Sequence, residues 1–446
     1  MQRVQSSQQG GERGRGSGGR ERVAVVGSGI AGLTAAYLLQ RRYDVTLFEA
    51  AARLGGHAHT HEVAGGQGRA VAVDSGFIVH NERTYPNLIK LFEQLGVATQ
   101  ETDMSMSVRC EGCGLEYAGA RGPRGLFAQG DSLVRPRFVR MLGEVKRFHR
   151  DARRLLIRDE CASGSWDPTL GEFLRARGYS AYFAEHFMLP LVSAVWSTGP
   201  ILARRYPARY LFRFLAHHGM LAIAGSPRWR TVAGGSRTYV ERAVKGLTAV
   251  QVSTPIRSIS RHEDGAPVRL RDASGESYAA DRVVIATHPD QALRMLAEPT
   301  ADERAVLGAI PYSSNETVLH TDARLLPRAR GARASWNYLL SGCAARPAPS
   351  GAAVVSYHMN RLHRLDEPVD YLVTMNAADR IGPDAVLARM VYEHPVYTPE
   401  SLAAQSRLPQ LNTLITAYAG AYHGWGFHED GCASGVAAAA AFGVAW

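Results

Sequence analysis

Lysine is nearly absent from this 446-residue chain, where Lys90, Lys146 and Lys245 are the only three among 51 basic residues. Arginine therefore carries almost all of the positive charge, and codon bias in a GC-rich genome explains this better than planar anion recognition does. The formal net charge is +10, but the excess is spread along the whole chain. The charge alone therefore gives no reason to expect a nucleic-acid partner.

Cysteine is also scarce, with five residues in the chain. An odd number of cysteines in a long sequence is not a disulfide framework, so a reducing cytoplasm is the expected compartment. Cys110 and Cys113 form one CxxC pair. Zinc needs two more ligands, and no second pair or histidine set follows closely. The sequence thus predicts a structural turn here and no metal site.

Long apolar runs are missing too, since no stretch approaches the roughly 18 apolar residues of a membrane span. Residues 1–20 are mostly Gln, Ser, Gly and Arg, which predicts a disordered leader and not a signal peptide. The basic aromatic stretch from Arg204 to Phe214 has two interpretations. It is either a solvated helix with one core face or a peripheral contact with the inner face of a membrane.

Local patterns predict an α/β protein. A β-branched strand at 22–26 is followed by glycines, a helix through Gln40 and a second strand at 44–48, which is a βαβ unit. The pattern is helical from about 131 to 225, and strand signals return at 250–259 and 282–286. Residues 311–376 suit an antiparallel sheet over a ligand. We expect a Rossmann-like domain with a parallel sheet, interleaved with a helical plus mixed-sheet substrate domain.

The first motif with chemical meaning is Gly27-x-Gly29-x-x-Gly32, placed directly after a strand and opening a helix. These glycines allow a tight turn and a close approach of the backbone to a pyrophosphate. The backbone N–H groups at the helix start, including those of Ile30 and Ala31, can then donate hydrogen bonds to the negatively charged phosphates. Glu49 closes the second strand, where its carboxylate can accept hydrogen bonds from a ribose. The unit therefore predicts dinucleotide binding.

A second glycine-bearing loop, Arg53-Leu54-Gly55-Gly56, can return to the same pyrophosphate. With Glu49, it resembles the extended fingerprint of the FAD-dependent amine oxidase and phytoene desaturase superfamily. The segments 73–76, 234–236, 252–256, 418–420 and 426–431 resemble that superfamily as well. The resemblance implies FAD as cofactor, with adenine contacts at Ile256 and the closing helix directed at the flavin. The predicted cofactor-binding residues are Gly27, Gly29, Ile30, Ala31, Gly32, Glu49, Ala50, Arg53, Gly55, Gly56, His57, Ile256, Gly420, His428 and Glu429.

The FAD-binding domain is predicted to be discontinuous, with segments 21–100, 231–290 and 411–446, and segments 101–230 and 291–410 form the substrate domain. In the histidine run that begins at His57, we expect the side chains to lie beside the flavin phosphates or ribityl. A covalent bond between His57 and FAD is an alternative.

Two departures from the superfamily bear on the reaction. Its amine oxidases carry a lysine that holds a water near the flavin, whereas this chain has no lysine after Lys245. The acid that usually follows the Ala-Gly of the closing motif is also missing after Gly420. An amine oxidase therefore stays an alternative, and hydride removal from carbon by a desaturase or oxidase is favoured.

Further segments, including 55–60, 74–81, 190–196 and 229–237, resemble bacterial flavoproteins similar to the oxidase-like N-terminal region of plant cyclopropane fatty-acid synthases. This branch implies lipid modification, with an acyl substrate and a functional link to a lipid methyltransferase. A non-catalytic flavin scaffold for such an enzyme is the third hypothesis. The resemblance places Trp196, Tyr338, Tyr357 and Trp425 near the flavin, although each could be a core residue. His423 and His428 are the candidate bases, and both could equally be cofactor contacts.

Overall fold

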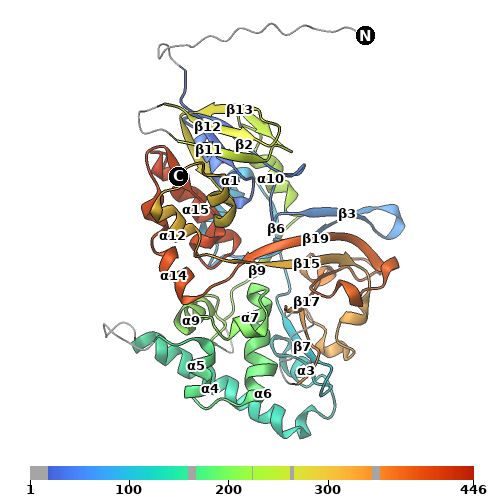
Figure 1. Cartoon of the computed structure of the whole chain (residues 1–446). Helices are drawn as coiled ribbons and strands as arrows, with labels where there is room; N and C mark the ends of the chain where they lie inside the picture. The colour runs from blue at the N-terminus through green and yellow to red at the C-terminus, as the bar shows by residue number, and fades with distance from the viewer. Residues whose placement is uncertain (1–18, 159–166, 223–224, 262–265, 344–351) are drawn as a thin grey trace.

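The computed structural model describes residues 19–158, 167–222, 225–261, 266–343 and 352–446, so most of the predicted leader lies outside the described residues. Figure 1 shows a parallel sheet with α1, α10 and α15 at one end and helices α4 to α9 at the other, with a long mixed sheet beside them. The prediction of an α/β fold with a parallel and a mixed sheet is confirmed.

The parallel sheet has the strand order β10-β2-β1-β14-β20. Its strands come from all three segments predicted for the FAD-binding domain, whose exact limits stay a prediction. Its central strands are almost fully buried, as expected where helices or a second sheet cover both faces. The bounds are β10 Ala249–Gln251, β2 Asp44–Phe48, β1 Arg22–Val26, β14 Arg282–Ile285 and β20 Thr416–Tyr418.

Helices α1, α2, α10 and α15 cover one face of this sheet, and an antiparallel three-stranded sheet lies with α11, α12 and α14 over the other. The helices are α1 Ile30–Leu39, α2 Pro86–Leu95, α10 Arg237–Ala243, α11 Pro289–Met295, α12 Ala301–Leu307, α14 Pro399–Gln405 and α15 His428–Ala441. The strands are β11 Ile256–Ser260, β12 Val268–Asp272 and β13 Ser277–Ala280. The single strand expected at 250–259 is divided into β10 and β11, because Ser253 adopts a left-handed backbone with φ +52°.

The half of the molecule away from the parallel sheet, which we call the second half, contains a seven-stranded sheet with the order β19-β15-β18-β17-β16-β7-β8. In this sheet β16 and β7 pair in parallel, and the other neighbours are antiparallel. The strands are β7 Met106–Cys110, β8 Glu116–Ala118, β15 Tyr312–His320, β16 Trp336–Leu340, β17 Val354–His358, β18 Leu372–Met375 and β19 Val386–Pro395. Two small sheets, of β3 Thr60–Ala64 with β4 Ala70–Asp74 and of β5 His80–Asn81, β9 Trp229–Val232 and β6 Thr99–Glu101, complete the strands.

The predicted helical region is present as a set of helices that packs against the mixed sheet in one large core. A π-helical turn, Ala184–Met188, joins α6 directly to α7. The helices are α3 Gly122–Leu126, α4 Pro136–Arg158, α5 Leu170–Ala176, α6 Ala181–Phe183, α7 Leu189–Trp196, α8 Pro200–Ala203, α9 Ala208–His217 and, after β17, α13 Met359–Leu362.

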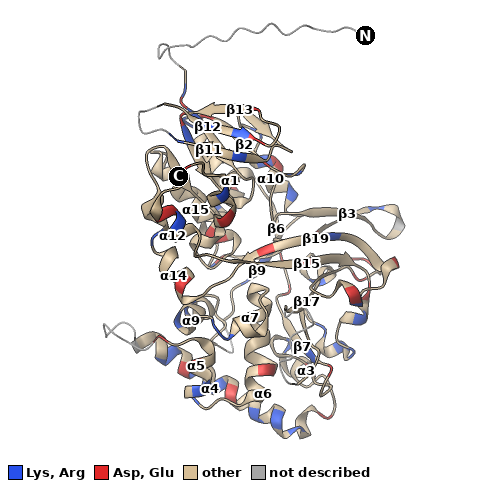
Figure 2. Ribbon diagram, in the orientation of Figure 1, with Lys and Arg blue, Asp and Glu red and all other residues tan. Residues whose placement is uncertain are grey.

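The arginine-rich stretch from 204 to 214 runs from the end of α8 into α9, which begins at Ala208. Tyr206, Leu211, Phe212 and Phe214 are buried, so these apolar side chains pack in the core and leave little to meet a lipid surface. None of the described helices is long and apolar enough to cross a membrane. Figure 2 shows arginine and lysine distributed over both halves of the molecule.

Candidate functional site

A cavity of about 900 Å³ lies where the carboxyl ends of the parallel strands face the second half of the molecule. The glycine loop, the end of β2 and the loop after β14 line one side. Helices α7 and α9 and strands β16, β17 and β19 line the other. Ligands of open parallel sheets bind at such a strand edge, and the volume suits a large organic cofactor together with part of a substrate.

The glycine loop between β1 and α1 shows why each glycine is needed. Gly27 has φ +103°, and a Cβ there would lie 2.6 Å from the backbone oxygen of Ala286. A Cβ on Gly32 would lie 1.9 Å from the backbone oxygen of Gly27, so this residue permits close helix packing and does not line the cavity. A Cβ on Gly29 would meet nothing within 4 Å, and no side chain caps α1 there. The loop thus presents an open backbone and a helix N-terminus to the cavity, as an anion requires.

Glu49 lies at the cavity wall at the end of β2. Its carboxylate accepts hydrogen bonds from the backbone N–H of Ser28, at 3.0 Å, and of Ala51, at 2.8 Å, while the Ser28 hydroxyl also donates to it. These bonds fix the acid beside Ala50, which also lines the cavity. The predicted contact with a ribose stays a prediction.

The second glycine loop lies directly on the first. Gly55 donates its N–H to the backbone oxygen of Ser28 at 3.1 Å, and a Cβ on Gly56 would be 3.0 Å from Cα of Gly29. Gly56 lines the cavity and Gly55 does not. The Arg53 guanidinium also lies off the cavity wall, where it donates long hydrogen bonds to backbone oxygens of its own loop.

The closing segment adds the opposite wall, with Gly420, Phe427 and His428 among the lining residues and α15 beginning at His428. Glu429 is placed differently from the other predicted cofactor residues. Its carboxylate accepts hydrogen bonds from the backbone N–H groups of Asn87 and Leu88, which anchors the start of α2, and it does not line the cavity.

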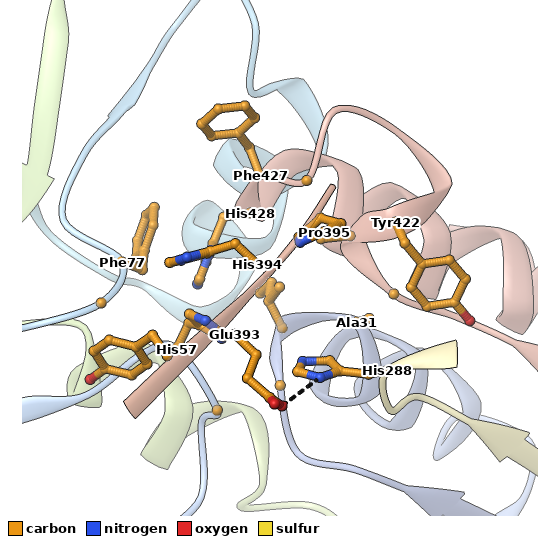
Figure 3. A pocket seen from close by; sticks show the side chains of 18 of the residues that line it. Ala31, His57, Phe77, His288, Glu393, His394, Pro395, Tyr422, Phe427 and His428 are labelled. Carbon is orange, nitrogen blue, oxygen red and sulfur yellow. Dashed lines mark ion pairs between the residues drawn. The ribbon is translucent and has the colours of Figure 1, made fainter. Parts of the chain in front are cut away.

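Five of the histidines that the structure describes line the cavity, and three of them, His57, His288 and His394, lie near one another, as Figure 3 shows. Burial lowers the pKa of all three, to about 4 for His394 and well below the usual value for His57, whose pKa His394 lowers further. Nδ1 of His288 lies 3.2 Å from a carboxylate oxygen of Glu393, within hydrogen-bond distance. Nε2 of His57 is buried and has no hydrogen-bond partner among the described residues. The cavity therefore offers neutral imidazoles that could meet a bound cofactor or substrate.

His288, His394 and Glu393 were not among the residues predicted from the sequence. The sequence could have identified His288, because it comes shortly after the strand predicted at 282–286, and ligands bind at the carboxyl edge of a parallel sheet. His394 and Glu393 lie at the end of β19, which was not predicted.

The two candidate bases differ in position. His428 lines the cavity, stacks on Phe77 with ring centroids 3.7 Å apart, and has Nε2 3.1 Å from the Tyr239 hydroxyl. His423 is half-buried and is not among the residues that line the cavity. Burial lowers the pKa to about 3 for His428 and to about 4 for His423. Both are neutral at pH 7, and only His428 is placed to contact a ligand.

The end of the cavity away from the glycine loop is aromatic and apolar. Of the four aromatic residues predicted near the flavin, Trp196 and Tyr357 line this end, whereas Tyr338 and Trp425 do not. The Trp425 backbone oxygen instead accepts the Trp196 indole N–H at 3.0 Å and fixes the orientation of that ring. Further lining residues at this end, which sequence analysis did not select, are Met104, Phe214, Met220, Trp336, Met375 and Phe427.

These features fit FAD. The open face of Gly29 and the uncapped start of α1 suit a pyrophosphate, while the unpartnered Nε2 of His57, a residue of the cavity wall, would be able to meet a polar group of the cofactor. Fold and cavity together define a flavin-dependent oxidoreductase. The sequence model of the family described as "Flavin containing amine oxidoreductase" matches residues 30–370, and this chain belongs to that family and uses FAD. Comparison with curated proteins finds no matching relative.

Solved structures share the fold over nearly the whole chain. Cyclohexylamine oxidase from Brevibacterium oxydans IH-35A has a TM-score of 0.67 and 16% identity, covering 95% of this chain and 98% of that one. A putative protoporphyrinogen oxidase from Exiguobacterium sp. 255-15 has a TM-score of 0.61 and 18% identity, with coverage of 93% and 97%. A fatty acid isomerase from P. acnes that produces CLA has a TM-score of 0.62 and 17% identity, with coverage of 93% and 97%. At these identities the likeness shows the fold.

Proposed function

We propose that this flavoenzyme oxidises or desaturates a carbon of an acyl-chain or similar lipid substrate. The observation that carries the proposal is the character of the cavity end beyond the histidines, where tryptophan, tyrosine, phenylalanine and methionine side chains form the wall. An apolar wall of this kind binds a hydrocarbon by excluding water.

The charged groups of the cavity support the same choice. Among the described lining residues, the carboxylates are those of Glu49 and Glu393. The first is hydrogen-bonded to Ser28 and Ala51, and the second lies within hydrogen-bond distance of His288. Both carboxylates are therefore already in contact with protein groups, and no lysine lines the cavity in the described part of the chain.

Bound FAD would supply the two-electron acceptor for this reaction. The chain's own residues would do the rest. Trp196 and Tyr357 would hold the substrate and exclude water, and a neutral imidazole at His57 or His428 would be able to accept a proton. The fold itself is compatible with such a substrate, because a fatty acid isomerase shares it.

We also propose that the chain belongs to a particular branch of the superfamily and works with a partner enzyme. The resemblance to the oxidase-like region of plant cyclopropane fatty-acid synthases supports a functional link to a lipid methyltransferase. Peripheral contact with the inner membrane face would bring the chain to such a substrate, although the burial of the aromatic residues of α9 gives it no support.

An anaerobic substrate screen tests the proposal. The purified yellow protein is mixed with unsaturated or methyl-branched phospholipids, with free fatty acids and with primary amines, and flavin absorbance is followed. Bleaching by the lipids alone supports an acyl oxidase, whereas bleaching by amines, followed by peroxide release once oxygen is admitted, identifies an amine oxidase. If no substrate bleaches the flavin and a partner methyltransferase loses its activity without this chain, the protein is a non-catalytic flavin scaffold and the acyl-chain proposal is wrong.

A cavity-filling variant adds a geometric test. Met104→Trp narrows the apolar end of the cavity, and Val139→Trp places the same side chain on the exposed surface of α4 as a control. We expect Met104→Trp to slow bleaching by long acyl chains about tenfold, as for other changes of pocket volume, and the control to leave it unchanged. Equal rates for both variants would place the substrate elsewhere.

A further inference from the structure

Four side chains of metal-binding type meet in the second half of the molecule, outside the FAD cavity. Cys110 ends β7, Cys113 lies in the turn before β8, Cys343 follows β16, and His186 lies in the π-helical turn before α7. One ligand atom from each lies within 4.8 Å of all the others. The sequence argument against zinc was that no further ligands followed the CxxC pair closely, but the fold brings two ligands from 73 and 233 residues away.

The separations match those of a tetrahedral zinc site. Zn–S bonds of about 2.3 Å and Zn–N bonds of about 2.0 Å place two sulfurs roughly 3.8 Å apart and a sulfur and a nitrogen roughly 3.5 Å apart. Here Cys110 Sγ and Cys343 Sγ are 3.9 Å apart, and Cys113 Sγ and His186 Nε2 are 3.6 Å apart.

His186 is oriented as a ligand. Its Nδ1 lies 3.2 Å from the backbone oxygen of Tyr182, and the ring stacks on that tyrosine with centroids 4.0 Å apart. When Nδ1–H donates to this oxygen, the lone pair of Nε2 points at the thiols, which is the arrangement that metal-binding histidines use. The side chain is fully buried. π-Helical turns are uncommon and often occur at functional positions.

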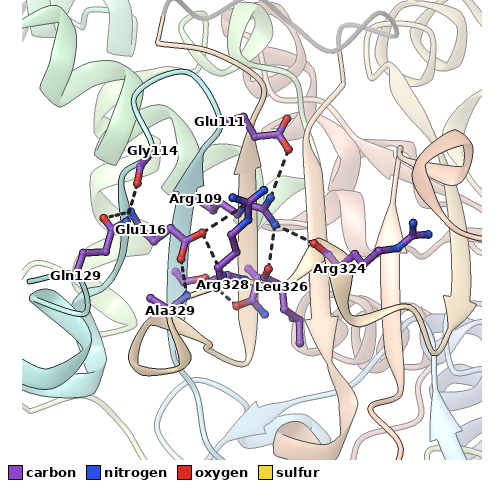
Figure 4. Close-up of polar contacts among 12 residues, drawn as sticks. Arg109, Glu111, Gly114, Glu116, Gln129, Arg324, Leu326, Arg328 and Ala329 are labelled. Atoms are coloured by element: carbon purple, nitrogen blue, oxygen red, sulfur yellow. Dashed lines mark hydrogen bonds and ion pairs between the residues drawn. The ribbon is translucent and has the colours of Figure 1, made fainter.

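The turn that carries the two cysteines is held by bonds that do not involve sulfur, as Figure 4 shows. The Gln129 amide donates to the backbone oxygen of Gly114 at 2.8 Å and accepts the backbone N–H of Glu116 at 2.9 Å. The Glu116 carboxylate accepts the N–H of Ala329 at 2.7 Å and pairs with Arg109. The thiols are therefore positioned before any ion binds.

Gly112 brings this turn close to Cys343. A Cβ at Gly112 would lie 2.8 Å from the backbone nitrogen of Cys343, so any larger residue would push the two segments apart.

We propose that Cys110, Cys113, Cys343 and His186 bind one zinc ion in a closed structural site. Three thiolates and one imidazole form a ligand set typical of structural zinc, and four protein ligands leave no position for a substrate. The thiols would lose their protons to the solvent when the ion binds, and no oxidation is involved.

The site would join three parts of the substrate-binding half. His186 lies ten residues before Trp196 along the turn and α7 that follow, a distance of roughly 15 Å at helical rise. The ion would thus fix α7 against the mixed sheet, and with it the tryptophan that lines the cavity. This proposal is independent of the acyl-chain proposal.

Metal analysis of the full-length holoprotein tests it. The protein is purified without a histidine tag, dialysed against metal-free buffer and analysed for zinc by mass spectrometry. We expect about one zinc per chain, and Cys113→Ser and Cys343→Ser should each lose it while keeping the yellow flavin absorbance. The control is Cys432→Ser, which alters a buried thiol bonded to Thr34 in the FAD-binding half and should keep the zinc.

Cobalt exchange gives a second readout that does not depend on a variant folding. Co²⁺ in a tetrahedral sulfur-rich site absorbs at longer wavelengths than flavin, so the wild-type protein should show these bands. Zinc far below one per chain after expression in zinc-supplemented medium, or a mass two hydrogens low from a disulfide, would overturn the proposal. Zinc retained in both cysteine variants would do so as well.

Discussion

A substitution at Gly29 can weaken FAD binding without disturbing the fold, because there is free space beside its Cα. In Gly29→Ala the added methyl group meets no protein atom within 4 Å, and the residue has φ −62°, which alanine adopts freely. The fold should therefore be unchanged. The methyl group projects from the loop that opens α1, where a pyrophosphate would have to approach the backbone N–H groups.

The expected loss follows from the hydrogen bonds that the methyl group prevents. A hydrogen bond to a charged group contributes about 1.5–3 kcal/mol. Losing two of them costs about 3–6 kcal/mol, which weakens FAD binding about 10²- to 10⁴-fold.

The assay is titration of the apoprotein with FAD, followed by quenching of flavin fluorescence, with thermal unfolding of the apoprotein measured in parallel. Gly143→Ala is the matched control, since Gly143 is exposed in α4 and its Cβ also meets nothing within 4 Å. The control should bind FAD normally and gain up to about 1 kcal/mol of helix stability. Wild-type affinity in Gly29→Ala would refute the placement of the pyrophosphate.

Two further predictions concern stability. Burial alone raises the pKa of Glu303, but hydrogen bonds from Arg261 and Tyr418 outweigh it and hold the pKa at about 2. This carboxylate thus stabilises the fold above about pH 4.5, by up to about 3 kcal/mol, and loses that effect as the pH falls toward 2. Urea unfolding should show Glu303→Gln less stable than wild type at pH 7, with the difference roughly halved at pH 3 and small at pH 2; a gap independent of pH would contradict this. In α15, a Cβ at Gly435 would lie 2.4 Å from a backbone oxygen of α1, whereas one at Gly431 would meet a side-chain methyl at 2.6 Å. Gly435→Ala should therefore lower the melting temperature more than Gly431→Ala does, because a neighbouring side chain can move aside and the backbone of α1 cannot. The opposite order of melting temperatures would be inconsistent with this packing.

The first βαβ unit was predictable because each of its signals is local. The strand at Arg22–Val26 and the strand at Asp44–Phe48 have the predicted bounds, and α1 ends one residue before the expected end at Gln40. The glycine loop was equally readable, since its spacing and its position after a strand already require a tight turn and an uncapped helix. The later FAD segments were found through their resemblance to a family and not from periodicity.

The rest of the site depends on contacts between distant segments. Strand β19 alternates half-buried and exposed residues over its first six positions without a clear apolar face, so it was missed together with His394 near its end. Whether Tyr357 or Tyr338 faces the cavity depends on register in the mixed sheet, which the sequence does not specify. The approach of Cys343 to Cys110 likewise follows from strand pairing, because β16 and β7 lie side by side.

The contact between α1 and α15 has a consequence for how the chain is made. The Thr34 hydroxyl pairs with Cys432, and the Tyr43 hydroxyl donates to the backbone oxygen of Phe442, across separations of 398 and 399 residues. Strand β20, at the edge of the parallel sheet, also comes from residues 416–418. During synthesis the ribosome therefore releases the glycine loop long before the helix that must pack against it. Contacts of such long sequence separation form slowly, so the nascent cofactor pocket must stay incomplete, and FAD capture must wait until translation has passed α15.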